Sequence, residues 1–357
     1  MNDSRLQALL RRELILKLGV IVVLLATALT VLLTVNNLLV SFVLAFVTNY
    51  LLSPIVDFLE RRGLSRRSAI LIPFVATGVL ICLAAYSVVP LIARQASALE
   101  AKLPKYQNDL LNLIAASEQH LQKLFQIRMT DFSETIHDWI ISQTATLSTQ
   151  IPSLVSGSLT VLILTPLLAL FMLQEGRTVS RKFLEMVPNS LFETTLKLHY
   201  QLNEQMGGFI RARFIEAAIV GIVVWLGLQI IGIPFATLLA LFAAITNLIP
   251  YIGPFIGAVP ALFIVLFSDD PAIAESLNWN LFWVTTIYFI AQLIDIVFII
   301  PLVVARLVNL HPATVIILII IGAQVMGILG MVISIPVAIA IKLIFKAFYE
   351  HILESPR

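Results

Sequence analysis

Apolar runs long enough to cross a lipid bilayer recur along most of this chain, and they constrain its fold more than any other feature. The first three extend over Leu14–Val35, Leu38–Phe58 and Ser68–Ile92. A helix needs about 20 apolar residues to cross the hydrocarbon core. Backbone polar groups inside that core must pair within the protein, which limits spanning structures to helices and closed barrels. The runs therefore predict an all-α polytopic membrane protein.

The composition agrees with a membrane fold and excludes several other classes. Of the 357 residues, 59% are hydrophobic and 12% are charged, whereas soluble domains carry about 25% charged residues. The formal net charge is only +2, so no basic excess indicates binding of nucleic acid. The one cysteine, Cys82, rules out a disulfide framework and a cysteine-ligated zinc site.

The polar segments divide the chain into four predicted regions. Residues 1–93 form an N-terminal scaffold of three spans. Residues 94–150 mix polar and apolar side chains at helical spacing, which predicts an extracytoplasmic amphipathic insertion. A fourth span and a basic cytoplasmic linker occupy 151–206, and a C-terminal core follows over 207–357. Because the insertion has little to bury alone, we expect it to pack against other copies in a homo-oligomer.

The positions of Lys and Arg predict the orientation in the membrane, because positive charge is retained on the cytoplasmic side. A cytoplasmic N-terminus would place the arginine-rich turn 61–67 inside, the insertion 94–150 outside and the linker inside. All but five of the 23 Lys and Arg residues then lie on the cytoplasmic side. We therefore expect a multi-pass protein with both termini in the cytoplasm.

Two long apolar tracts in the C-terminal core, 235–267 and 313–347, contain helix-breaking residues near their middle. A straight helix of either length would reach about 50 Å at ~1.5 Å per residue, which exceeds the ~30 Å hydrocarbon core. We expect both tracts to be interrupted re-entrant hairpins, and kinked spans are the alternative. The chain would then have about eight spanning or re-entrant elements, including an inverted pair of helix-plus-broken-hairpin units in its C-terminal half.

Interrupted segments in corresponding places of two inverted halves indicate a transporter's binding site near the membrane midplane. Backbone groups freed at such breaks can contact a polar ligand. Residues 207–357 are therefore the predicted transport core. The candidate residues for binding a solute or an ion are the polar and helix-breaking residues of its two halves: Asn247, Pro250, Gly253, Pro254, Gln292, Asp295, Gln324, Gly327 and Gly330.

Asp295 is the candidate for coupling, because it lies deep inside an apolar run with Gln292 one turn earlier. A charged side chain at the bilayer centre costs about 2.5–3.5 kcal/mol on insertion scales. It should therefore face a polar interior, a bound cation or a proton. The alternative is a structural hydrogen-bond anchor that pairs with Gln324 or Asn247.

Glu216, Arg213 and His311 are further candidates for coupling or gating. The alternative for Glu216 is a local ion pair with Arg213, three residues earlier on the same helix. The alternative for His311, which precedes Pro312, is a loop cap.

Enzyme signatures are missing from the sequence. It contains no phosphate-binding G-x-x-x-x-G-K-[ST] loop, no H-E-x-x-H and no G-x-S-x-G. The five histidines lack metal-ligand spacing. We therefore expect no enzyme, no cofactor and no metal site. Any uphill transport would use a gradient of H⁺ or Na⁺, or a partner ATPase.

Ordered motifs over nearly the whole chain resemble the autoinducer-2 exporter family, a family of bacterial inner-membrane permeases. They include Asn247-Leu-Ile-Pro-Tyr-Ile-Gly-Pro254, Gln292-x-x-Asp295, Leu310-His311-Pro312 and Gly327-Ile-Leu-Gly330. The resemblance implies a location in the inner (cell) membrane. It also implies export of autoinducer-2, a small hydrophilic quorum-sensing molecule, by some members and exchange of sodium or lithium for protons by others.

The expected function is secondary-type export of a small hydrophilic solute such as autoinducer-2. A sodium or lithium/proton antiporter is the first alternative. The second alternative is a non-transporting membrane scaffold that recruits a partner through its insertion. In each case the expected surroundings are the lipid bilayer and further copies of the chain, with no nucleic acid.

Overall fold

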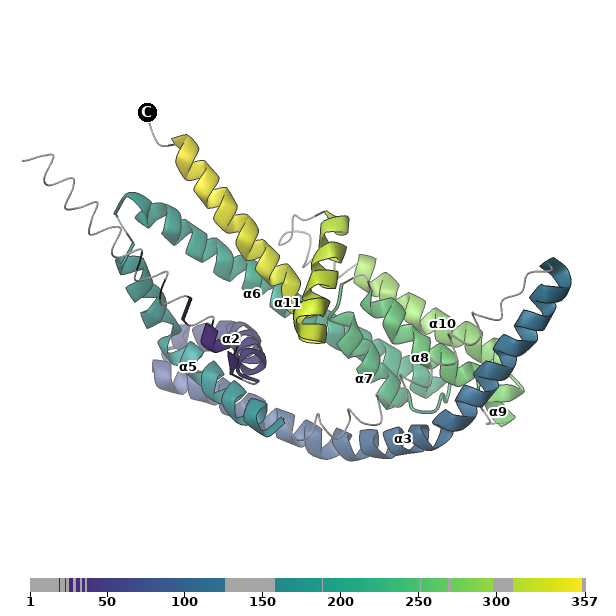
Figure 1. Ribbon diagram of the computed structural model, residues 1–357. Helices are drawn as coiled ribbons and strands as arrows, with labels where there is room; N and C mark the ends of the chain where they lie inside the picture. The colour runs from purple at the N-terminus through teal and green to yellow at the C-terminus, as the bar shows by residue number, and fades with distance from the viewer. Residues whose placement is uncertain are drawn as a thin grey trace, which may run out of the picture. The chain divides into compact units, whose positions relative to one another are not determined.

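The computed structural model describes residues 37–125, 158–187, 189–250, 252–268, 271–297 and 311–354, and single positions between 19 and 35. Most of the predicted first span and residues 126–157 therefore lie outside the described residues. The described ranges contain helices and turns and no strand (Figure 1). The helices are α2 (Leu38–Arg61), α3 (Arg66–Phe125), α5 (Ser158–Glu185), α6 (Asn189–Ile230), α7 (Ala236–Asn247), α8 (Gly253–Leu266), α9 (Pro271–Ala274), α10 (Leu277–Ile294) and α11 (Pro312–Glu354).

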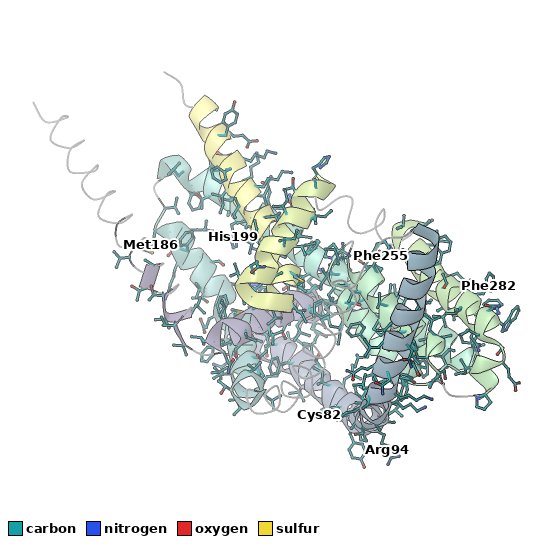
Figure 2. All side chains as sticks on the ribbon, turned by 45° about the vertical axis from the view of Figure 1, so that its right-hand side comes forward. Cys82, Arg94, Met186, His199, Phe255 and Phe282 are labelled. Atoms are coloured by element: carbon teal, nitrogen blue, oxygen red, sulfur yellow. The ribbon has the colours of Figure 1, made fainter. Side chains whose placement is uncertain are left out.

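Five of these helices contain stretches long and apolar enough to cross a membrane: Leu38–Arg61, Arg66–Asn112, Thr160–Glu185, Leu277–Val297 and Ala313–Ala347. Only 17% of the apolar window in α3 and 11% of that in α11 is buried inside the structure. Large apolar side chains project outward instead, as the exposed Phe282 of α10 does in Figure 2. Such a surface suits hydrocarbon rather than water. The prediction of an all-α polytopic membrane protein is confirmed.

The chain forms two compact units. Unit 1 comprises 1–78, 157–211 and 333–357, and unit 2 comprises 79–156 and 212–332. In unit 1, α2 packs along α5. Leu52 and Val56 of α2, Ile70 of α3 and Leu173 of α5 share one buried cluster.

Tyr50 connects α2 to α6 within unit 1. Its hydroxyl donates a hydrogen bond to Asn203 Oδ1 at 3.0 Å. A Cβ placed on Gly207 would lie 2.7 Å from the Tyr50 ring. The glycine therefore allows α6 to lie directly against the aromatic ring.

In unit 2, α8 packs against both α7 and α10. The core formed by these helices also includes Tyr106 of α3, whose ring meets Phe263 of α8 edge-on at 5.9 Å between centroids. Gln95 of α3 accepts a hydrogen bond from the Leu238 backbone N–H at 3.0 Å and so caps the first turn of α7. The described part of the predicted insertion therefore packs within its own chain, because its apolar face has a partner there.

The tract 235–267 consists of two short helices of 12 and 14 residues that pack on each other. Their close approach depends on Gly253, at the start of α8. A Cβ at this position would lie 1.9 Å from the Thr246 carbonyl oxygen. Neither helix reaches the ~20 residues needed to cross the hydrocarbon core, which agrees with a re-entrant arrangement.

The second tract, 313–347, makes up most of α11, which doubles back at Met326 and Gly327 (Figure 1). Gly327 has φ 60° and ψ −139°, a conformation that favours glycine. After the bend, Gly330 faces Gly322 so closely that a Cβ on Gly330 would lie 2.0 Å from the Gly322 carbonyl oxygen. Two glycines therefore make room for this turn, and a third forms it.

The substitution Gly253→Ala tests the contact between α7 and α8. The added methyl group would overlap backbone atoms, so the free energy of unfolding should fall by about 1–3 kcal/mol or more. Thermal unfolding of the purified protein in detergent measures this change. Gly78→Ala is the matched control, because a Cβ at Gly78 has no atom within 4 Å. Equal stability of the two variants would contradict the close packing.

Candidate functional site

Four buried polar residues gather in unit 2: Arg213, Glu216, Asn247 and Asp295. We call them the buried polar cluster. Their relative exposure ranges from 1% for Glu216 to 7% for Arg213. Charged side chains are almost never buried this fully without partners. The burial of these charged and polar side chains in unit 2 therefore needs a structural or functional reason.

Three helices supply the cluster. Arg213 and Glu216 are three residues apart in α6 and so share one helical face. Asn247 is the last residue of α7, directly before the interruption that leads to α8. Asp295 follows the end of α10 and begins a short π-helical turn over 295–297. Turns of this kind are rare and occur frequently at functional sites.

Glu216 is the centre of the cluster. Its Oε1 accepts a hydrogen bond from Arg213 Nη1 within a buried salt bridge. The same oxygen accepts a second hydrogen bond from Asn247 Nδ2 at 3.3 Å. One carboxylate oxygen therefore connects the guanidinium group of α6 to the amide at the end of α7.

The carboxyl group of Asp295 lies close enough to that of Glu216 for their charges to interact. Asp295 Oδ2 also accepts a long hydrogen bond of 3.5 Å from Gln292 Nε2. Glu216 Oε2 and Asp295 Oδ1 are both buried, and neither has a donor among the described residues. Two ionised carboxylates close together would repel each other, whereas protonation of one of them would remove this repulsion.

The charges of the cluster do not balance. Arg213 carries one positive charge, whereas Glu216 and Asp295 carry two negative charges when both are ionised. A buried net charge is costly unless it is paired. One proton or one monovalent cation at the two carboxyl groups would make the cluster neutral, so the arrangement can bind and release a single positive charge.

The structure brings together five of the residues selected from the sequence. Arg213, Glu216, Asn247 and Asp295 form the buried polar cluster, and the half-buried Gln292 contacts it through Asp295. Glu216 forms the local ion pair with Arg213. Glu216 also lies near Asp295. The sequence did not predict the second contact, because the two acids lie on different helices.

The remaining selected residues belong to the helix interruptions. Pro250 lies in the connection from α7 to α8, and Gly253 and Pro254 are the first two residues of α8. Gly327 and Gly330 shape the bend of α11.

Two selected polar residues are exposed and lie apart from the hydrogen bonds of the cluster. Gln324 is exposed, and no hydrogen bond between it and Asp295 occurs among the described residues. His311 is exposed as well, and its Nδ1 accepts a hydrogen bond from the Ala313 backbone N–H at 3.3 Å. His311 therefore caps the first turn of α11, which is the geometry of the loop-cap alternative.

Arg213→Met tests how strongly the cluster depends on its one guanidinium group. Removing one partner of a buried ion pair costs about 3–5 kcal/mol, because the other charge stays buried alone. We expect a loss of this size in the free energy of unfolding, measured by thermal or denaturant unfolding in detergent. The double variant Arg213→Met, Glu216→Met should recover part of it.

Arg181→Met is the matched control, since Arg181 also pairs with a glutamate on its own helix. Its side chain is 82% exposed, against 8% for Arg213. Exposed pairs contribute about 0–1 kcal/mol, so the control should be nearly silent. Similar losses in both variants would show that the burial of the cluster has no energetic consequence.

Comparison with known proteins identifies relatives over nearly the whole chain. A family model described as "AI-2E family transporter" matches residues 18–350. YueF of Bacillus subtilis (strain 168) is 30% identical over 320 residues, which cover 87% of this chain and 84% of YueF. PerM of Escherichia coli (strain K12) is 27% identical, with 88% of each chain covered. Their names describe the first as a transport protein and the second as a permease, both only provisionally.

A third relative has a name that includes a substrate. TqsA of Escherichia coli (strain K12), named an AI-2 transport protein, is 25% identical over 315 residues. The match covers 86% of this chain and 85% of TqsA.

Proposed function

This chain belongs to the AI-2E transporter family, and we propose that it is a proton-coupled exporter of a small hydrophilic solute such as autoinducer-2. It would act in the bacterial inner membrane with both termini in the cytoplasm. The family supports a transporter, and the name of TqsA supports the choice of solute. The burial of the neighbouring Glu216 and Asp295 carboxyl groups, each with one oxygen that has no donor among the described residues, is the observation that carries the coupling mechanism.

A proton suits this pair because it requires only two oxygen atoms. Glu216 Oε2 and Asp295 Oδ1 each lack a donor among the described residues, so either oxygen could take up the proton. A dehydrated metal cation requires a larger cage of oxygen ligands. The other oxygen of Glu216 is already occupied by Arg213 and Asn247. The pair therefore favours coupling to H⁺ over coupling to Na⁺.

Protonation of the pair can bias the conformation of the protein. With one proton bound, Arg213 balances the one remaining carboxylate, so the cluster is stable when buried. Loss of that proton leaves one uncompensated negative charge, which favours any conformation that exposes the cluster to water. Each protonation state thus stabilises a different conformation, which is the thermodynamic requirement for coupling.

The end of α7 supplies a polar group for the solute. Asn247 is the last residue of α7, and α8 begins beyond the interruption at Gly253. The backbone N–H groups of Gly253 and Ile256 in the first turn of α8 are already bonded to the carbonyl groups of Ile249 and Ile252. A small solute rich in hydroxyl groups would therefore hydrogen-bond with the side-chain amide of Asn247. Because Asn247 also contacts Glu216, solute binding and protonation would share a residue.

The test is proton flux in vesicles that contain the purified protein, recorded with an internal pH dye. Autoinducer-2, sodium and lithium are added in separate experiments. We expect autoinducer-2 to drive proton movement in the wild type. In Asp295→Asn this flux should fall to the level of protein-free vesicles, because the carboxyl pair can no longer bind and release its proton. Insertion should persist, since the substitution removes a costly charge.

Asp109→Asn is the matched control, because Asp109 lies in α3 outside the buried polar cluster. It should keep the wild-type flux. Undiminished flux in Asp295→Asn would overturn the coupling role of this residue. Flux driven by sodium or lithium alone would establish the antiporter instead. Absence of flux and of solute movement in the wild type would favour the non-transporting scaffold.

A further inference from the structure

The turn between α2 and α3 contains four arginines within seven residues: Arg61, Arg62, Arg66 and Arg67. It belongs to unit 1 and lies where two apolar helices end and begin. If these arginines served only to keep the turn on one side of the membrane, their number would matter and their individual contacts would not. The structure adds that the four side chains have different surroundings.

Arg66 is neutralised within the protein. Its Nη1 forms a salt bridge with Glu60 Oε1 at 2.9 Å, and its Nη2 donates to the Leu173 carbonyl oxygen at 2.6 Å. Arg177 of α5 binds the other oxygen of Glu60 at 2.8 Å and Asp57 Oδ1 at 2.6 Å. Both acidic residues next to the turn are therefore already paired with Arg66 and Arg177.

Arg61, Arg62 and Arg67 are exposed, and none has an acidic partner among the described residues. Their three positive charges are therefore a surplus at the end of the helix pair. The Arg62 guanidinium lies over the Phe58 ring, 4.8 Å from its centroid. This cation–π contact holds one of the three cations against an apolar surface.

The surface next to these arginines is apolar and exposed. Ile55 and Phe58 of α2 and Leu71 and Ile72 of α3 are large side chains within two turns of the arginine-rich turn, and all four are exposed. In a chain that spans a bilayer, such side chains contact lipid tails. The three arginines therefore lie at the depth where lipid headgroups begin. At this depth the headgroup of an anionic lipid can contact the arginines while its acyl chains contact the apolar side chains.

We propose that Arg61, Arg62 and Arg67 bind the phosphodiester headgroup of an anionic phospholipid whose acyl chains pack along Ile55, Phe58, Leu71 and Ile72. Guanidinium groups suit this ligand because their planar donors match phosphate oxygens. The pairing of Arg66 and Arg177 with Glu60 and Asp57 is part of the site, because it prevents these acids from neutralising the other arginines. The bound lipid would anchor the ends of α2 and α3 at the membrane surface.

Titration of the detergent-solubilised protein with phosphatidylglycerol tests the proposal, with phosphatidylcholine and inorganic phosphate as separate ligands. Native mass spectrometry counts the retained lipid and gives the affinity. The variant R61Q/R62Q/R67Q should bind phosphatidylglycerol about a hundredfold more weakly, since each arginine near a lipid surface contributes about fivefold. Binding of phosphatidylcholine should be weak and equal in both proteins.

K182Q/K197Q/K346Q is the control for general charge, because it removes three exposed cations elsewhere in unit 1. It should keep the affinity for phosphatidylglycerol. The single variants R62Q and R67Q retain most of the positive charge of the turn, so they remain informative if the triple variant inserts poorly. Each should lose about fivefold.

Three outcomes would overturn the proposal. Equal losses in the arginine and lysine variants would mean that lipid binding depends only on total charge. Unchanged binding in R62Q and R67Q would show that Arg62 and Arg67 do not bind the lipid. Inorganic phosphate that competes with phosphatidylglycerol at similar concentrations would identify a site for free phosphate rather than for a lipid.

Discussion

The free-energy cost of leaving a polar group unpaired away from water governs this structure. It explains why the described chain is helical, because a helix pairs nearly all of its backbone groups internally. It also explains why Arg213, Glu216, Asn247 and Asp295, from three separate helices, lie together in unit 2. No single residue of this group could be buried alone at low cost. The residues that are hardest to bury therefore specify where α6, α7 and α10 meet.

Glycine provides the second constraint, which acts through distance. The interrupted segments need backbones closer together than any side chain permits, as at Gly253 beside Thr246 and at Gly330 beside Gly322. These contacts let a chain segment turn within a largely apolar tract. The turn between α7 and α8 also leaves Asn247 at a helix end, beside Glu216. The same helix interruptions thus explain both the close glycine contacts and the position of Asn247 beside Glu216.

The sequence predicted the fold class and pointed to all four members of the buried polar cluster for one reason: an ionisable or amide side chain inside an apolar run is conspicuous. It could not predict that Glu216 and Asp295 would meet, because they lie on different helices and nothing local relates them. It also suggested that Gln324 could pair with Asp295, whereas Gln324 is exposed. The third span was expected to end at Ile92, but α3 continues to Phe125. Hydrophobicity changes there, whereas helical periodicity does not.

The cap that Gln95 provides to α7 has a consequence for the order of folding. The two bonded residues, Gln95 and Leu238, are 143 positions apart. During synthesis α3 is therefore complete long before the first turn of α7 exists, and that turn lacks this cap until the two segments meet. Contacts between such distant positions require closure of a large loop and generally form slowly. The first hairpin thus depends on a helix that must already be in place to receive it, which makes α3 a template for a segment synthesised much later.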